Sequence, residues 1–470
     1  MQPARLAVPG IALLTGVLLL VASRNYGYFF DEAYFVVAGH DHLAWGYFDQ
    51  PPLVPALAGL AQQLFPGSLV ALRLPVTLAG AAGVWLAGMT AKELGGRVPA
   101  QVLAATAYAL SGAVRVAHWL ATYSLDPFFW TLILWLVVRW TRRRDDRLLL
   151  AAGVVTAFSL ETKFLVPALW AALAVTSLLF GPRELLRRPL LWVGGLIAVL
   201  ATVPTLVWQA THGWPYTHMQ QVVAAEFPGL GGYLWDGLAG AGLLAGLPLL
   251  LFGLGWLLRS REYRFLGVTV LGLVVAFAVT SGRSYYLFSL YSVPFAAAAV
   301  GLQEIRWPRV LKWSGALVLA ASVVNALLSI PVYPKAVAQR LPDVPFTVTA
   351  KTYVEADGLL VPLAQQIDQT YLALPPELRA HTAVLTDSYV FAAGVDMFGA
   401  AVPRAYSGHR GYYYFGKPPE QDDTVLFFGT QNPALQKAFT SAQPIVPDFA
   451  TLYTGRTVSW EQLWPRLRTQ

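Results

Sequence analysis

Apolar runs, each about as long as a membrane is thick, recur between residues 6 and 330. A helix needs about 20 mostly apolar residues to cross the hydrocarbon core of a bilayer. Eleven runs approach that length: 6–22, 70–91, 98–117, 125–141, 148–162, 164–180, 190–208, 233–258, 265–280, 286–302 and 313–330. Hydrophobic residues form 56% of the 470 and charged residues 13%, which excludes an ordinary soluble enzyme. The sequence predicts a polytopic α-helical membrane protein with about 11 transmembrane helices.

Basic residues are unevenly divided between the two predicted sides of the membrane. With the N-terminus inside, the inner loops up to residue 330 carry seventeen Lys and Arg, Arg5 among them, and the outer loops carry five. Cytoplasmic loops of membrane proteins hold this excess of positive charge. The net charge of +7 is therefore explained by topology, and no nucleic-acid partner is expected. Cleavage after the first run, at Val21-Ala22-Ser23, is an alternative that would break the alternation of the later loops.

The chain changes character after the last apolar run. Residues 1–330 are predicted to form the transmembrane domain, with a long outer loop at 24–69, and residues 331–470 contain no spanning segment. Eleven spans would place this tail on the same side as the first loop. Its composition predicts a small C-terminal extracytoplasmic α/β domain.

Two short runs in the tail predict strands, at Thr382–Thr386 and Thr424–Phe428, because they are β-branched or aromatic and end at turn residues. Asn432 predicts the cap of a helix over residues 433–441, and Pro433 suits the first position of that helix.

Polar residues gather at the outer junctions between the predicted spans. These are Asp31 and Glu32; His118, Tyr123 and Asp126; Glu161 and Lys163; His212 and His218; and Arg283, Tyr285 and Tyr286. Ionisable groups at membrane depth are costly and tend to be functional. The adjacent acids Asp31 and Glu32 begin a predicted helix over 31–46, where the simpler interpretation is that the helix dipole favours acids.

Other residue types give weaker indications of chemistry. His40 and His42 flank Asp41, but two residues at i and i+2 do not share a helix face, so no metal site is predicted there. Cysteine is absent, which excludes disulfides and thiol chemistry. No nucleotide-binding loop follows the strand that ends before Gly429.

Several segments taken in order resemble the protein O-mannosyltransferase-like superfamily of C-type (GT-C) glycosyltransferases, which also includes bacterial aminoarabinose transferases. DEAYF at 31–35 and YFDQPPL at 47–53 resemble the first periplasmic loop of this superfamily. Further similar segments are LRLPVTLAG (72–80), ELGGR (93–97), HWLATYSLDP (118–127), LETKF (160–164), WQATHGW (208–214), SGRSYYLFSLYSVP (281–294), TDSYVFAAGVDMFG (386–399) and YSGHRGYYYFG (406–416). The sequence departs from many relatives at Gln50, where they carry histidine.

The resemblance implies an inverting transfer of a sugar from a polyprenyl phosphate, usually the undecaprenyl carrier, to a hydroxyl group. Asp31 would be the general base, Glu32 would help to bind the acceptor, and Asp126 would be a second catalytic acid. Lys163 and Arg283 would bind the donor phosphate, with Tyr285 and Tyr286 beside it. No cofactor is required, and a divalent metal ion is compatible with the reaction without being indicated.

The remaining expectations concern partners and location. His409 and Arg410, next to three consecutive tyrosines, suit acceptor binding, although the tyrosines equally suit the core and surface of an α/β domain. The acceptor would be a lipid, a glycan or a protein, and membrane lipids surround the spans. The expected location is the bacterial inner membrane, with the N-terminus cytoplasmic and the tail periplasmic. The alternative function is a polytopic transporter or lipid-carrier flippase, which the lack of an internal repeat disfavours.

Overall fold

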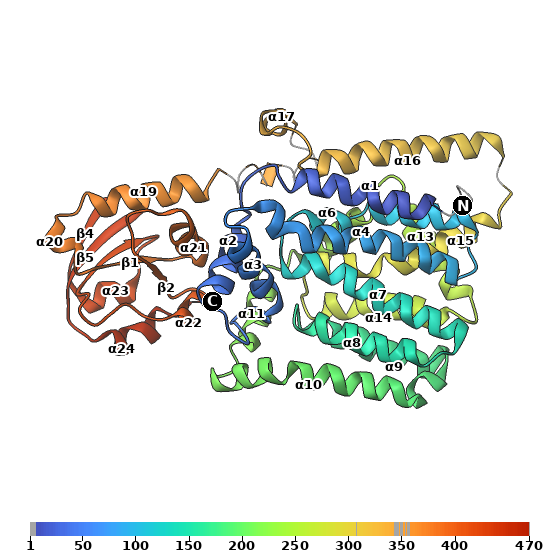
Figure 1. The fold of residues 1–470 in the computed structure, drawn as a ribbon, viewed down its shortest axis with the longest axis horizontal. Coiled ribbons are helices and arrows are strands. Elements are labelled where there is room, and N and C mark those ends of the chain that lie inside the picture. The colour runs from blue at the N-terminus through green and yellow to red at the C-terminus, as the bar shows by residue number, and fades with distance from the viewer. Residues whose placement is uncertain are drawn as a thin grey trace. The chain divides into compact units, whose positions relative to one another are not determined.

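The computed structural model describes residues 6–306, 308–342, 347, 351–352, 354 and 358–469, and Arg5 lies outside this part of the chain. The chain is mostly helical, with one five-stranded sheet near its C-terminus (Figure 1). It divides into two compact units. Unit 1 comprises Met1–Asn25, Ser68–Ala210 and Gln220–Lys351, and unit 2 comprises Tyr26–Gly67, Thr211–Met219 and Thr352–Gln470.

Unit 1 is a bundle of apolar helices. Its helical elements are α1 (Ala7–Ala22), α4 (Leu69–Glu93), α5 (Val98–Ala109), α6 (Gly112–Arg115), η2 (Val116–His118), α7 (Thr122–Arg143), α8 (Arg147–Leu160), α9 (Val166–Phe180), η3 (Arg183–Arg187), α10 (Pro189–Thr211), α11 (Met219–Ala225), α12 (Gly229–Gly240), α13 (Gly246–Arg259), α14 (Arg264–Val279), η5 (Ser284–Leu290), α15 (Ser292–Gln303), α16 (Arg309–Ser329) and α17 (Lys335–Arg340). The end of α10 and the first residue of α11 are grouped with unit 2.

Fewer helices meet the criteria for a complete membrane span than the sequence predicts. Among the described residues, α4, α10 and α16 are long and apolar enough, and two bent pairs, α5 with α6–η2 and η5 with α15, raise the number to five. Most of the other predicted spans fall on helices that are shorter: α1, α8, α9, α13 and α14 have 14 to 16 residues. The predicted run 233–258 is divided by a turn at Gly242, whose φ is +98°. The count of eleven spans is therefore not confirmed.

Small residues let the helices of unit 1 approach closely. A Cβ added at Gly253 of α13 would lie 1.8 Å from the carbonyl oxygen of Pro294 in α15. A Cβ added at Gly153 of α8 would lie 2.2 Å from the Cα of Gly194 in α10. Because apolar surface gains little by leaving lipid, membrane helices depend on such close backbone packing. We expect substitutions at these glycines to separate the helices.

Unit 2 combines helices of the first loop with the C-terminal sheet. Its elements are α2 (Phe30–His40), α3 (Leu53–Leu64), η4 (Pro215–His218), α19 (Leu360–Leu372), α20 (Pro376–Arg379), β1 (Thr382–Thr386), α21 (Tyr389–Phe398), β2 (Ala405–Ser407), α22 (Tyr412–Phe415), β3 (Thr424–Phe428), α23 (Pro433–Ala438), β4 (Phe439–Val446), β5 (Ala450–Arg456), α24 (Trp460–Leu463) and η6 (Trp464–Leu467). The strand order is β2-β1-β3-β5-β4. Strand β1 is parallel to β2 and β3, whereas β5 is antiparallel to its neighbours.

The predicted elements of the tail are largely confirmed. Strands β1 and β3 have the predicted bounds, and the Asn432 side chain accepts hydrogen bonds from the backbone N–H groups of Ala434 and Leu435 at the start of α23. Helix α23 ends at Ala438 rather than residue 441, because Phe439 already pairs with β5.

Helix α2 also ends earlier than predicted, at His40 rather than residue 46. The hydroxyl of Tyr47 donates to the carbonyl of Ala38 at 3.0 Å. It replaces the backbone N–H group that would donate to this carbonyl if the helix continued for another turn. The aromatic residue after the predicted helix therefore ends it.

Candidate functional site

The carboxylate of Asp31 lies in the first turn of α2 and is held by a tyrosine from the tail. The hydroxyl of Tyr389 donates to Asp31 Oδ1 at 2.7 Å. Tyr389 is the first residue of α21, directly beyond the carboxyl end of β1, where the Ser388 side chain caps the helix. Ligands of open α/β sheets bind at this carboxyl edge. The fold of unit 2 thus fixes the orientation of Asp31.

Glu32 has a structural contact of its own. It is fully buried, and its Oε2 accepts the backbone N–H of Phe29 at 2.9 Å. A residue at this position commonly reaches back to satisfy an N–H group at the start of its helix. The two adjacent acids therefore differ: Glu32 caps α2, whereas Asp31 contacts Tyr389 of the sheet region.

A second carboxylate, Asp49, lies in the same cluster. Asp49 Oδ1 accepts the hydroxyl of Tyr34 at 3.0 Å. Burial raises the pKa of Asp49 to about 6, the negative charge of Asp31 adds to this, and the Arg410 guanidinium and the Tyr34 hydroxyl oppose it. Asp49 therefore takes up a proton only as the pH falls through about 6, and at neutral pH it is mostly ionised.

His409 and Arg410, the two residues of the tail predicted to bind the acceptor, lie in this cluster. Arg410 Nη1 donates to the hydroxyl of Tyr389 at 3.4 Å, and its guanidinium lies 5.1 Å from the centre of the Tyr389 ring. His409 Nδ1 accepts the backbone N–H of Tyr389 at 3.4 Å. Both therefore contact the residue that holds Asp31. Burial raises the pKa of Tyr389 well above its usual value, which keeps its hydroxyl a donor.

Backbone geometry keeps Arg410 in place. Its φ is +49°, in the left-handed region that side chains other than glycine rarely adopt, and its N–H donates to the Thr469 carbonyl at 3.1 Å. A Cβ at the next residue, Gly411, would lie 1.9 Å from the Tyr34 hydroxyl. The loop after β2 is therefore shaped for close approach to α2.

A different cluster forms in unit 1 around Lys163. The Lys163 ammonium lies 4.8 Å from the centre of the Tyr285 ring and 4.3 Å from that of Tyr286, both in η5. Lys163 is buried at the turn between α8 and α9, where its N–H donates to the Ser159 carbonyl. Tyrosine faces stabilise a desolvated cation. Three of the residues predicted at the donor phosphate, Lys163, Tyr285 and Tyr286, are thus brought together.

Asp126 lies close enough to Lys163 for their charges to interact. It sits near the start of α7, is 3% exposed, and its Oδ1 has no hydrogen-bond partner among the described residues. A buried carboxylate oxygen without a hydrogen bond lowers the stability of the fold, so its presence suggests a function. Asp126 thus belongs to the cluster around Lys163 in unit 1.

Arg283 extends the cationic cluster. Its Nη1 donates to the Tyr285 hydroxyl at 2.9 Å, and its Nη2 pairs with Glu226, which follows α11. The pair is partly exposed, because Glu226 is 45% accessible. The carboxylate of Glu226 therefore competes with any anion that approaches Arg283.

Other polar residues from the outer junctions are placed elsewhere. His118 Nδ1 lies 2.6 Å from the Arg115 carbonyl, and the His212 ring lies 6.0 Å from that of Tyr414. Gln50, at the position where many relatives carry histidine, is buried, and its Nε2 has no partner within the described part of the chain. His118 and His212 thus each have a contact within their own unit.

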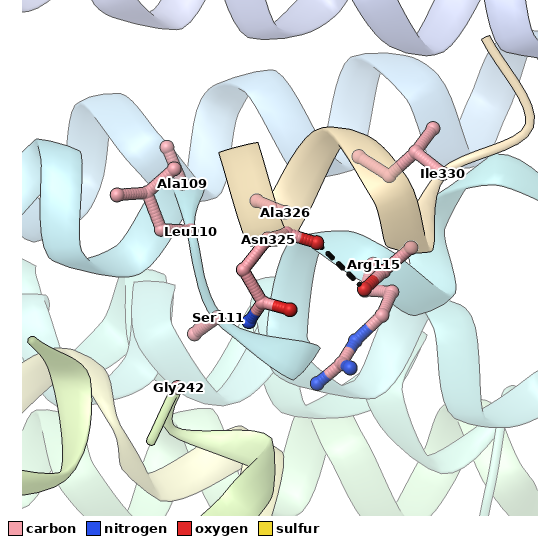
Figure 2. Close-up of a pocket in the computed structure, with 9 residues that line it drawn as sticks. Ala109, Leu110, Ser111, Arg115, Gly242, Asn325, Ala326 and Ile330 are labelled. Atoms are coloured by element: carbon pink, nitrogen blue, oxygen red, sulfur yellow. Dashed lines mark hydrogen bonds between the residues drawn. The ribbon is translucent and has the colours of Figure 1, made fainter. Parts of the chain in front are cut away.

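A small cavity adjoins the bend between α5 and α6. Arg115 and Asn325 of α16 both line it, as Figure 2 shows. Its volume is about 10 Å³, which is room for about one water molecule. The cavity is too small for a sugar or a lipid chain.

The described residues contain no group of three or more His, Asp or Glu arranged to hold a metal ion. The His40 ring lies 2.6 Å from Asp41, while His42 stacks on Phe415 with ring centres 4.3 Å apart. The two histidines thus face different neighbours.

Sequence reasoning did not single out Tyr389, Tyr34, Asp49 or Glu226. The first three lie inside segments that carried the family resemblance, at 31–35, 47–53 and 386–399. A search for polar residues within those segments would have found them. Glu226 lies outside every such segment, and its contact with Arg283 depends on tertiary structure.

Comparison with known proteins supports the resemblance. Residues 49–208, about a third of the chain, match the family described as dolichyl-phosphate-mannose-protein mannosyltransferase. The comparison with curated proteins finds no match to this sequence. The structure is similar to that of ArnT from Cupriavidus metallidurans bound to undecaprenyl phosphate, with a TM-score of 0.62, 14% identity, and coverage of 95% of this chain and 97% of ArnT.

The same ArnT in its apo state gives a TM-score of 0.60 at 16% identity, again covering 95% of this chain and 97% of ArnT. The chain therefore has the fold of ArnT, and its residues 49–208 carry the sequence pattern of the dolichyl-phosphate-mannose-protein mannosyltransferases.

Proposed function

We propose that this protein is an inverting membrane glycosyltransferase that moves a sugar from a polyprenyl phosphate, such as undecaprenyl phosphate, to a hydroxyl acceptor. The observation that carries the proposal is the carboxylate of Asp31, oriented by Tyr389 at the carboxyl edge of the sheet. The fold shared with ArnT, which was crystallised with undecaprenyl phosphate, supports this class of donor.

In the proposed reaction, an acceptor hydroxyl attacks the anomeric carbon of the sugar. The bond from that carbon to the phosphate oxygen breaks, and the polyprenyl phosphate leaves with the electron pair. Asp31 takes the hydroxyl proton as the new bond forms, which requires it within about 3 Å of that oxygen. Attack from the face opposite the leaving group inverts the configuration.

The leaving phosphate needs positive charge more than a proton. Lys163 and Arg283 supply that charge, and Arg283 can donate two parallel hydrogen bonds to phosphate oxygens. The rings of Tyr285 and Tyr286 keep the Lys163 cation stable while it is desolvated. Asp126 acts in the departure of the phosphate, where its carboxylate interacts electrostatically with the ammonium of Lys163.

His409 and Arg410 are proposed to contact the acceptor, since they surround Tyr389 in the cluster that contains the base. The acceptor is a lipid, glycan or protein hydroxyl. We further propose that the protein crosses the bacterial inner membrane eleven times, with residues 331–470 on the extracytoplasmic side.

A transfer assay tests the proposal against a transporter or flippase. The purified protein in detergent, with undecaprenyl-phosphate-linked hexose and a hydroxyl acceptor mixture, should release undecaprenyl phosphate and form a glycosylated product. An enzyme works without a sealed membrane, whereas a transporter changes only the side on which the intact donor lies. Donor that crosses sealed vesicles unchanged, with no product in detergent, would contradict the proposal.

A further inference from the structure

An apolar groove lies at the surface of unit 1, among α8, α9 and α10. Its volume is about 340 Å³, within the range of about 300–1,000 Å³ typical of small-molecule sites. Thr156 and Leu160 of α8, Trp170 of α9, and Gly195 of α10 are among its lining residues. Figure 1 shows α10 at the edge of the bundle, next to α8 and α9.

The polar atoms of the groove wall are already satisfied. Trp170 Nε1 donates to Thr156 Oγ1 at 2.8 Å, and Thr156 Oγ1 donates to the Ala152 carbonyl at 2.8 Å. Trp192 Nε1 donates to the Leu186 carbonyl at 2.8 Å. The groove therefore offers apolar contacts and no polar group that a ligand must match.

The groove is open at the surface of the helix bundle. Two of its lining residues in α10, Trp192 and Val199, are 64% and 56% exposed. Helix α10 itself is long and apolar enough to span a membrane, yet only 22% of its most apolar stretch is buried within the protein. A hydrocarbon chain is the ligand that such a surface meets.

The two ends of the groove differ in charge. Near Leu160, the carboxylate of Glu161 accepts a hydrogen bond from Thr205 of α10 at 2.7 Å. At the other end, Arg187 and Arg188 lie between Leu186 and Leu191, which both line the groove. A carboxylate repels a phosphate and a guanidinium attracts one, so an anionic headgroup belongs at the arginine end.

The arginines at that end are not equally engaged. Arg188 lies 3.7 Å from Asp146, and Arg144 lies 2.6 Å from Glu184. Arg187 is exposed, and the structure gives it no ion pair among the described residues. Helix α8 has 14 residues, so this end is roughly 20 Å along the helix from Lys163.

We propose that the groove binds one acyl chain of an anionic phospholipid, whose phosphate contacts Arg187. Basic residues at the end of an intramembrane groove recognise such headgroups. The lipid would fill the space that α10 leaves beside α9 and would hold α10 against the bundle. This site is separate from the Lys163 cluster proposed for the donor phosphate.

The test measures lipid binding to the purified full-length protein by native mass spectrometry. Phosphatidylglycerol, phosphatidylcholine with the same acyl chains, and undecaprenyl phosphate are titrated in turn. Arg187→Gln should weaken phosphatidylglycerol binding about five- to tenfold, whereas Arg261→Gln, an exposed arginine after α13, should not.

Filling the groove tests the acyl chain. A Cβ at Gly195 meets no atom within 4 Å, so the Gly195→Leu variant should fold normally. The leucine side chain should fill the groove and weaken the binding of phosphatidylglycerol at least tenfold. Gly272→Leu in α14, equally open, is the matched control. The chain has no cysteine, so Val199→Cys carries a single fluorophore that brominated phosphatidylglycerol should quench.

Two results would overturn the proposal. Equal affinity for phosphatidylglycerol and phosphatidylcholine, unchanged by Arg187→Gln, would make the groove a nonspecific apolar surface. Loss of undecaprenyl phosphate binding in Gly195→Leu, with phosphatidylglycerol unaffected, would assign the groove to the polyprenyl chain. If Gly195→Leu fails to fold, absence of quenching at residue 199 in the otherwise wild-type chain would be equally decisive.

Discussion

The candidate residues of unit 1 and unit 2 form clusters of opposite chemistry. In unit 2, Asp31 and Asp49 are held by the hydroxyls of Tyr389 and Tyr34. In unit 1, the Lys163 cation lies against the faces of two tyrosine rings. Tyrosine serves both, since its hydroxyl donates to an anion and its ring attracts a cation. The difference teaches that proton transfer and phosphate binding can be tested separately.

The largest expected effect is that of replacing Asp31, the proposed general base. Asp31→Asn should lower kcat about 10²–10⁴-fold, because an amide cannot accept the proton. Donor affinity, assigned to the other cluster, should remain within a few-fold of wild type. The kcat and the dissociation constant of undecaprenyl phosphate are measured on the same preparation.

The matched control for the base is Asp41→Asn, since Asp41 is an exposed carboxylate at the other end of α2. It should leave kcat nearly unchanged. Wild-type turnover in Asp31→Asn would remove Asp31 from the mechanism and would leave the carboxylate cluster without a catalytic role.

The next largest effect is expected from replacing Arg283, which is proposed to bind the donor phosphate. Arg283→Ala should weaken the binding of undecaprenyl phosphate about tenfold or more, because a hydrogen bond to a charged group contributes about 1.5–3 kcal/mol. Arg283→Lys should restore affinity only partly, since an ammonium lacks the planar fork with which a guanidinium donates two parallel hydrogen bonds to a phosphate. Binding is measured by isothermal titration in detergent.

Arg24→Ala, an exposed cation at the end of the first helical segment, serves as the control for general loss of charge. Equal affinity for undecaprenyl phosphate in wild type and Arg283→Ala would show that Arg283 only anchors its loop through Glu226 and Tyr285.

A smaller effect of the opposite sign is expected at Glu226. Glu226→Gln removes the carboxylate that pairs with Arg283, so donor affinity should rise several-fold. The exposed pair contributes little in itself, which keeps the gain modest. Asp236→Asn is the control, because Asp236 accepts a hydrogen bond from Ser284 instead. Weaker donor binding in Glu226→Gln would mean that the ion pair positions Arg283 for the phosphate.

The smallest effect concerns pH. Burial raises the pKa of Asp49 from 3.8 to about 6, so the folded state binds a proton that the unfolded state releases. The stability from this proton is fully present below pH 3.8 and is lost as pH rises through about 6. Thermal unfolding midpoints between pH 4 and 7 should therefore fall less in Asp49→Asn than in wild type.

Asp396 provides the comparison, since burial also raises its pKa to about 6. Asp49→Asn should remove only the part of the pH dependence of the unfolding midpoint that comes from Asp49. Asp396→Asn should remove a part of similar size. Parallel curves for wild type and Asp49→Asn would show that Asp49 stays ionised in the folded state.

Elements with strong local signals were predictable. Strands β1 and β3 have the predicted bounds, and α23 begins at the residue that Asn432 caps. Where α2 ends was not predictable, because the Tyr47 hydroxyl that replaces its next turn comes from beyond the helix. The interruption of the apolar run 233–258 was not predictable either, since apolar composition does not show where a turn such as that at Gly242 divides a run.

The candidate site shows the same division. Asp31, Lys163 and Arg283 could be named from residue type, position and family resemblance. Their partners could not: Tyr389 lies 358 residues from Asp31, and Glu226 lies 57 residues from Arg283. Such contacts depend on how distant segments pack.

By itself the sequence determined an apolar, polytopic chain, the identity of the ionisable residues and the position of two strands, because these follow from composition and local periodicity. Only the tertiary structure decided which acid caps its helix and which meets a tyrosine, as Glu32 and Asp31 do. The physical reason is that hydrogen bonds and charge pairs act over a few ångströms in space, whatever the separation along the chain.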